Sequence, residues 1–152
     1  MLAPGTNAPE FSLSTTPDQK IQLSQFKGKR VILAFYPADW SPVCSDQMAL
    51  YNEMLKLFHK QKAEIFGISV DTPFTLAKFM EENNYQFPLL SDFNKTVSTA
   101  YDCLYEEFAF GMKGVSKRAA FVIDEEQNII YAEVLENAKE LPDFAAINEA
   151  LK

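Results

Sequence analysis

The stretch that decides the fold is residues 31–46, which read VILAFYPADWSPVCSD. Its first five residues are all apolar, which is typical of a buried strand. A short loop with two prolines follows, and a helical pattern begins near Asp46. A strand that leads through a short loop into a helix is the building unit of layered α/β proteins. The pattern therefore predicts that Cys44 lies on the first turn of a helix.

This position favours reactivity of the Cys44 thiol. The first turn of a helix has backbone N–H groups without partners and carries the positive end of the helix dipole. Both stabilise a thiolate, which is the form of cysteine that attacks electrophiles. Cys44 is therefore the first candidate for a functional residue.

The rest of the chain continues the alternation of strand and helix patterns. Apolar runs predict strands at Val31 to Tyr36, Ile65 to Val70, Phe87 to Leu90, Ala119 to Ile123 and Ile129 to Val134. Helical spacing predicts helices at Ser45 to Lys62, Thr72 to Asn84, Lys95 to Leu104 and from Pro142 onward, with Phe74, Ala77, Phe79 or Met80 as the buried stripe of the second. Segments Glu10 to Ser14 and Ile21 to Phe26, around a Thr16-Pro17-Asp18 turn, predict an N-terminal hairpin. We expect one α/β domain over residues 1–152, with residues 106–117 as a loop.

Composition excludes several classes of function. The 152 residues carry a formal net charge of −7, so no basic excess is present to bind nucleic acid or an anionic membrane. The N-terminus has no signal-peptide pattern, and no apolar stretch is long enough to cross a bilayer. Two cysteines are too few for a secreted disulfide framework. We expect a cytoplasmic protein.

Three common uses of a cysteine do not fit this sequence. The only histidine, His59, lies in the same predicted helix as Cys44, separated from it by roughly 22 Å at about 1.5 Å per residue, so a Cys-His pair is excluded. One histidine and two distant cysteines match no metal-ligand spacing, and we expect neither a metal nor another cofactor. A disulfide-exchange motif needs Cys-x-x-Cys, but Ser41 occupies the place of the first thiol.

The residues just before the thiol suit a lone nucleophile. The Ser41 hydroxyl can donate to and accept from a bound substrate, and the N–H groups of Val43 and Cys44 supply fixed dipoles for a developing oxyanion. Pro37 can cover the sulfur without adding a competing donor. Tyr36 and Trp40 line the mouth of the site, belong to a dimer surface or pack in the core.

The motif Pro37-x3-Ser41-x2-Cys44 resembles the active-site motif of peroxiredoxins, the thiol peroxidases. The segment KRAAFVID at residues 117–124 is similar to the one that brings the family's arginine to the sulfur. Further similar segments are APEFSL at 8–13, FGISVD at 66–71 and FPLLSD at 87–92. Residues 39–47 most resemble the one-cysteine and bacterioferritin-comigratory-like branches.

This resemblance implies a fold, a reaction and a set of site residues. The fold is thioredoxin-like, with a mixed central sheet and helices on both faces. Cys44 is the peroxidatic nucleophile, Arg118 holds the thiolate and orients the peroxide, Ser41 binds the peroxide oxygens and Pro37 shields the sulfur. The reaction reduces hydrogen peroxide or an organic hydroperoxide and leaves Cys44 as sulfenic acid. The family also implies a homodimer through the active-site end.

The return of sulfenic acid to thiol is where the sequence departs from several family branches. The position five residues after Cys44, which often holds a resolving cysteine, is Ala49 here. Cys103 is either a resolving cysteine or a buried core thiol, and its apolar neighbours favour the core. We therefore expect an external thiol, such as thioredoxin, glutaredoxin or a small thiol, to reduce Cys44. A redox sensor or chaperone on the same fold, or an inactive binding module, are the alternatives.

Overall fold

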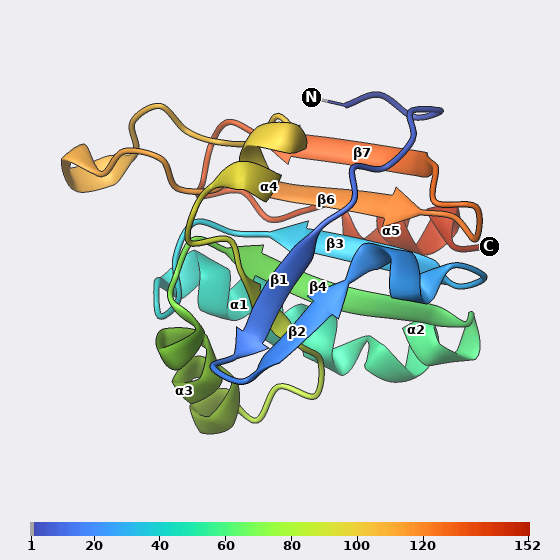
Figure 1. The fold of residues 1–152 in the computed structure, drawn as a ribbon, viewed down its shortest axis with the longest axis horizontal. Helices are drawn as coiled ribbons and strands as arrows, with labels where there is room; N and C mark the ends of the chain where they lie inside the picture. The colour runs from blue at the N-terminus through green and yellow to red at the C-terminus, as the bar shows by residue number, and fades with distance from the viewer. Residues whose placement is uncertain (1) are drawn as a thin grey trace.

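The structure is a computed structural model that describes residues 2–152, arranged as a central sheet with helices packed against it (Figure 1). The sheet order is β2-β1-β5-β4-β3-β6-β7. Its strands are β1 (Ser12–Thr16), β2 (Gln19–Gln22), β3 (Arg30–Phe35), β4 (Ala63–Ser69), β5 (Leu89–Ser91), β6 (Arg118–Ile123) and β7 (Ile129–Leu135). The helices are α1 (Pro42–Glu53), α2 (Leu55–Lys60), α3 (Pro73–Asn83), α4 (Thr96–Ala100) and α5 (Phe144–Ala150), with 3₁₀ turns η1 (Leu23–Phe26) and η2 (Ala109–Gly111).

The three strands β3, β4 and β5 run parallel at the centre of the sheet, and the remaining pairs are antiparallel. The predicted mixed sheet and N-terminal hairpin are therefore confirmed. Because β3, β4 and β5 are parallel, the loops that follow them meet at one edge of the sheet. The Cys44 loop follows β3 and belongs to this edge.

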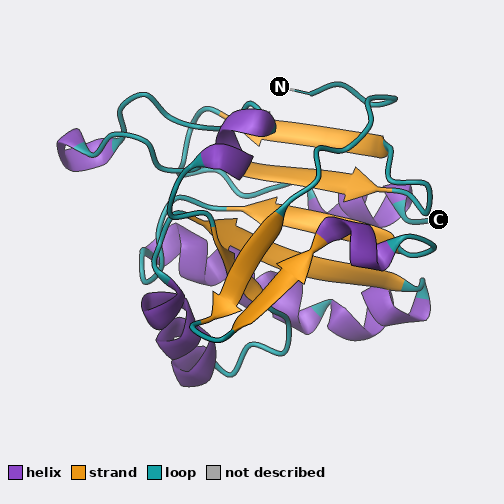
Figure 2. Cartoon of the chain, in the orientation of Figure 1, coloured by secondary structure: helices purple, strands orange, loops and turns teal. Residues whose placement is uncertain are grey.

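Alternating side chains along the central strands build two separate cores. On one face, Ile32 and Ala34 of β3 pack with residues of α1, α2, α3 and α5. On the other face, Val31 and Leu33 pack with residues of η1, α4 and the N-terminal strand. Figure 2 shows the helices distributed over both faces of the strands. The period-2 alternation of a strand explains why both faces of β3 are apolar, as a fully covered central strand requires.

Four details differ from the sequence prediction. The second strand of the N-terminal hairpin, predicted at Ile21 to Phe26, is β2 and ends at Gln22, and residues 23–26 form the 3₁₀ turn η1. The predicted helix Ser45 to Lys62 is two helices that meet at Met54, which has φ −89° and ψ 0°, and α1 already begins at Pro42. The helix predicted from Lys95 ends at Ala100, because Tyr101 and the left-handed Asp102 close it early. Phe74 is 72% exposed rather than buried, since Leu76 and Phe79 form the apolar stripe of α3.

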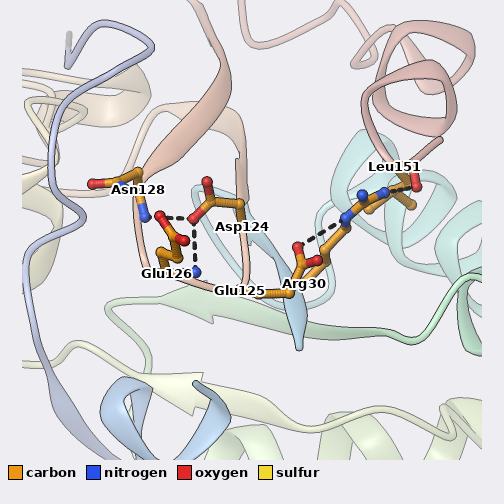
Figure 3. Close-up of polar contacts among 6 residues, drawn as sticks. All are labelled: Arg30, Asp124, Glu125, Glu126, Asn128 and Leu151. Atoms are coloured by element: carbon orange, nitrogen blue, oxygen red, sulfur yellow. Dashed lines mark hydrogen bonds and ion pairs between the residues drawn. The ribbon is translucent and has the colours of Figure 1, made fainter. Parts of the chain in front are cut away.

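The edge of the sheet opposite the Cys44 loop is held by a polar turn (Figure 3). The Asp124 carboxylate accepts hydrogen bonds from the backbone N–H groups of Glu126 and Asn128, which fixes the hairpin loop between β6 and β7. Arg30, at the start of β3, pairs with Glu125 at 3.1 Å and donates to the carbonyl of Leu151. These contacts tie α5 to the sheet. No helix among residues 2–152 is long and apolar enough to cross a membrane.

Candidate active site

Cys44 is the third residue of α1, and its side chain is fully buried. Ser41 is the N-cap residue in extended conformation, and Pro42 follows at the first helical position, where its fixed φ suits a helix start. The local sequence therefore sets the start of the helix two residues before the thiol. Cys44 therefore lies in the first turn, at the positive end of the helix dipole and beside backbone N–H groups that have no partner within the helix.

Arg118 contacts the Cys44 sulfur across 74 residues of sequence. It is the first residue of β6, which pairs antiparallel with β3 so that Ala119 lies opposite Phe35. This register brings the start of β6 beside the end of β3, next to the loop that leads to Cys44. Arg118 is 1% exposed, and its Nη1 donates to the Cys44 Sγ at 3.3 Å. The guanidinium therefore faces the thiol with its charge shielded from bulk water.

Two further contacts hold the Arg118 guanidinium in place. The side-chain oxygen of Gln47 accepts from Arg118 Nη1 at 2.5 Å, and the carbonyl of Ala138 accepts from Nη2 at 2.8 Å. Gln47 is fully buried in α1, and its own Nε2 donates to the carbonyl of Phe35 at 3.5 Å. Sequence reasoning assigned Gln47 no role at the site. Its spacing of three residues from Cys44, which puts both on one helix face, is the signal that was available.

A pocket of about 430 Å³ opens over these residues. The predicted residues Pro37, Ser41 and Val43 line it together with Arg118, and the fully buried Cys44 contacts it only through Arg118 and its helix neighbours. Residues 108–110 and 137–139 form the opposite wall. The Ser41 hydroxyl donates to the carbonyl of Ala38 at 3.3 Å. A small polar group can thus reach the first turn of α1 and Arg118, while an apolar group can lie against Phe108 and Phe110.

Cys103 lies far from this arrangement in the fold. It is fully buried just after α4, in the core on the face of the sheet opposite the core that contains Cys44. Burial, with further contributions from Asp92 and Asp102, raises the pKa of the Cys103 thiol well above its ordinary value. Both cysteines are free thiols. His59 is exposed near the end of α2, so the break at Met54 does not bring it into the buried Cys44 site.

The remaining aromatic residues of the loop divide between core and surface. Tyr36 is fully buried, and its hydroxyl donates to Asp39 at 2.6 Å. Trp40 is 51% exposed and packs edge-on against Phe79 at 4.9 Å. Of the alternatives that the sequence left open, Tyr36 packs in the core, whereas Trp40 lies partly at the surface.

A buried thiol at a helix N-terminus, faced by an arginine on a mixed sheet, is the arrangement of a thiol-based redox enzyme. Comparison with known proteins gives the same answer. The family model described as the AhpC/TSA family matches residues 4–132. The putative peroxiredoxin Rv2521 of Mycobacterium tuberculosis is 37% identical over 134 residues, covering 87% of this chain and 85% of that protein. Bovine peroxiredoxin-2 is 32% identical, covering 97% of this chain and 75% of that protein.

Solved structures agree with this assignment. The crystal structure of the peroxidoxin BcpB from Mycobacterium tuberculosis superposes with a TM-score of 0.84 at 28% identity, covering 99% of this chain and 95% of that one. A peroxiredoxin-like protein from Aquifex aeolicus gives a TM-score of 0.89 at 26% identity, covering 99% and 86%. The chain belongs to the AhpC/TSA family of peroxiredoxins. It is a thiol-dependent peroxidase with the thioredoxin-like fold, which uses a peroxide as substrate and a thiol as reductant.

Proposed function

We propose that Cys44 is the peroxidatic nucleophile and that Arg118 activates both the thiolate and the peroxide. The observation that carries this proposal is the 3.3 Å contact between Arg118 Nη1 and the Cys44 sulfur. An arginine presents several N–H donors in one plane, which suits charge that spreads over two peroxide oxygens. Its burial strengthens this interaction because water does not screen it.

The proposed reaction proceeds by attack of the Cys44 thiolate on the terminal oxygen of a hydroperoxide. The S–O bond forms as the O–O bond breaks, and the leaving oxygen takes a proton to become water or an alcohol. Cys44 is thereby oxidised to sulfenic acid. The Ser41 hydroxyl and the N–H of Val43 hold the peroxide oxygens, and Pro37 shields the sulfur. The position of all three on the wall of the Arg118 pocket supports these roles.

An external thiol then returns Cys44 to its reduced form. The first thiol displaces water from the sulfenic acid to give a mixed disulfide, and a second thiol releases Cys44 and leaves as the disulfide of the reductant. The burial of Cys103 on the opposite face of the sheet supports an external reductant. A direct bond between Cys44 and Cys103 requires their Cα atoms to come within about 7 Å, and hence local unfolding.

A pair of serine variants tests these assignments. Stopped-flow fluorescence of Trp40, the only tryptophan, follows oxidation on mixing with hydrogen peroxide or an organic hydroperoxide. We expect Cys44→Ser to abolish both oxidation and turnover, while Cys103→Ser retains turnover with a panel of thioredoxin, glutaredoxin and small thiols. Selective loss of turnover in Cys103→Ser, or an intramolecular disulfide seen by non-reducing mass spectrometry, would assign the resolving role to Cys103.

We further propose that the enzyme forms a homodimer through the active-site edge of the sheet. Three exposed aromatic residues lie in segments that follow the parallel strands β3, β4 and β5 and therefore share this edge. They are Trp40, Phe74 and Phe93, with exposures of 51%, 72% and 58%. Such a group of apolar side chains is typical of an interface between proteins. We expect light scattering to give a dimer for the wild type, and a monomer for Phe74→Ser combined with Phe93→Ser.

A cytoplasmic location completes the proposal. Both cysteines are free, as thiols are kept in a reducing compartment, and the proposed reaction consumes thiol reductant that such a compartment supplies. Fractionation of cells that express the protein at natural levels tests this location.

A further inference from the structure

The loop that carries Pro37 and Ser41 is anchored by a pair of carboxyl groups, Asp39, which is buried, and Asp71, which is half-buried. Asp39, in the middle of this loop, is 8% exposed. Its backbone N–H donates to Asp71 Oδ2 at 2.9 Å, and Asp71 follows the end of β4. The Ser69 hydroxyl donates to the same Asp71 oxygen at 2.8 Å. The loop is therefore tied to the central sheet through Asp71.

The two carboxyl groups of this pair have unequal partners. Asp71 Oδ2 accepts two hydrogen bonds, one from the Asp39 N–H and one from the Ser69 hydroxyl. Asp39 Oδ1 accepts one hydrogen bond from the Tyr36 hydroxyl at 2.6 Å, while Asp39 Oδ2 is buried with no hydrogen-bond partner among residues 2–152. A buried carboxylate oxygen without a donor, close to a second carboxylate, is costly when it is charged. Protonation of Asp39 removes this cost.

Among residues 2–152, no cationic side chain contributes to the electrostatics of Asp39. The titratable groups that face Asp39 are Tyr36 after β3, Asp71 after β4 and Tyr85 after α3, and all of them are neutral or acidic. Burial first, and then the nearby Asp71 charge, raise the pKa of Asp39 from 3.8 to about 7. Asp39 thus changes its charge within the physiological range of pH.

The loop also contains one residue in a strained backbone conformation, which the contacts of Asp39 help to maintain. Trp40, next to Asp39, has φ +71°, in the left-handed region that residues with a side chain avoid. A strained conformation persists only where surrounding contacts enforce it. When the contacts of Asp39 weaken, relaxation of Trp40 favours an open loop.

We propose that Asp39 is a positioning residue of the peroxidase site, and that as a neutral acid it latches residues 37–41 closed whereas its ionisation releases them. This inference rests on the proposed roles of Pro37 and Ser41, because the latch matters to catalysis through these residues. In the open loop, Asp39 is solvated and ionises at its ordinary pKa. Opening therefore becomes more favourable as the pH rises from about 4 to about 7, and levels off above that.

Amide hydrogen exchange of residues 38–41 tests the latch independently of peroxidase activity. The parent protein is Cys44→Ser, so that ionisation of the thiol does not contribute. At each pH, the exchange rate of this parent is divided by the rate of its Asp39→Asn derivative. This ratio cancels the chemical pH dependence of exchange, which is the same in both proteins. Asparagine resembles a protonated aspartate and cannot ionise. We expect the ratio to rise at least about tenfold between about pH 5 and pH 8.

Two matched variants control for other titrating groups. Asp46→Asn removes an exposed carboxylate from the same helix start, and His59→Gln removes the only histidine. For both variants, we expect that the ratio of the parent's exchange rate to the variant's does not change with pH. If the ratio of the parent's exchange rate to that of Asp39→Asn does not change with pH, the proposal is wrong. It is also wrong if the ratio of the parent's rate to that of His59→Gln shows the same rise.

A second variant keeps the proposal testable if Asp39→Asn does not fold. Asp71→Asn retains an oxygen that accepts from the Asp39 N–H but removes the charge that opposes ionisation of Asp39. We expect the pH-dependent rise in loop exchange to be smaller in Asp71→Asn than in the parent, and an unchanged or larger rise would contradict the latch. If the loop opens with pH as proposed but peroxide does not oxidise Cys44 in the wild type, the proposed function is refuted while the latch is not.

Discussion

At the residue scale, the site depends on how firmly Arg118 is held against the Cys44 sulfur. The guanidinium is positioned by the backbone of Ala138 on one side and by the Gln47 side chain on the other. Its Nε is buried with no partner in the part of the chain that the structure describes. Arg118 is thus fixed by contacts at its two terminal nitrogens, one of which also faces the sulfur.

The planar shape of Arg118, and not only its charge, is expected to matter. Lysine keeps the positive charge but cannot contact Gln47, Ala138 and the sulfur at the same time. We expect Arg118→Lys to reduce the second-order rate of Cys44 oxidation by about 100-fold, comparable to the loss of a donor that stabilises a transition state. Stopped-flow fluorescence measures this rate. A near-native rate would show that charge alone is sufficient.

Gln47 is expected to act through Arg118. Gln47→Leu leaves Arg118 Nη1 without this acceptor, and we expect about a tenfold slower oxidation of Cys44 and a loss of about 1–3 kcal/mol of stability. Gln47→Glu restores an oxygen at the same place and is expected to recover most of the rate. Failure of Gln47→Glu to recover more than Gln47→Leu would argue for a role in packing only.

The sequence was informative for some of these residues and not for others. Cys44, Ser41 and Pro37 lie within one short motif, so local spacing was enough to place them together. Arg118 was found only through the family resemblance, because no local pattern links residues 74 positions apart. Gln47 and Asp39 are polar residues whose burial depends on tertiary contacts, and their place beside the candidate site could not be predicted from composition or periodicity.

At the scale of elements, strand patterns predicted more than helix patterns did. The predicted strands occur with shifts at their ends, since a covered strand needs an apolar run that is easy to recognise. The break between α1 and α2 was not predicted, because Met54 is a good helix former and no proline or glycine marks the position. Phe74 was misplaced because its neighbours Leu76 and Phe79 satisfy the same helical spacing.

One glycine sets how closely β4 and β5 can pack. Gly67 pairs with Leu89, and a Cβ added at Gly67 would lie 2.5 Å from the Leu89 Cδ2 atom. We expect Gly67→Ala to destabilise the protein by about 1–3 kcal/mol, because Leu89 is buried and has little room to move. Urea denaturation measures this change. Combination with Leu89→Val should recover part of the loss, and strictly additive effects would exclude the contact.

At the scale of the whole molecule, the sheet order places the reacting parts together. Cys44 follows β3, and Arg118 begins the neighbouring β6, so one strand pairing assembles the site. The alternation of strands and helices predicted an α/β sheet, but the strand order came only with the structure. Many orders satisfy the same alternation, and long-range contacts decide among them.

The buried Asp39 is expected to influence the stability of the whole protein as well as its loop. In the folded protein its pKa is about 7, compared with 3.8 in the unfolded chain. Between these values the folded state holds a proton that the unfolded state has lost. The contribution of Asp39 to the free energy of unfolding should therefore fall as the pH rises from about 4 to about 7, and stay level above that.

The Asp39→Asn variant isolates this contribution. Other carboxyl groups, such as Glu10, titrate in the same way in both proteins, so the difference in unfolding free energy between variant and wild type reports Asp39 alone. We expect this difference to change in favour of Asp39→Asn by a few kcal/mol between about pH 4 and pH 8, measured by urea denaturation at each pH. A difference that is independent of pH would mean that Asp39 has the same pKa in the folded and the unfolded chain. The burial of Asp39 beside Asp71 would then not contribute to the pH dependence of stability.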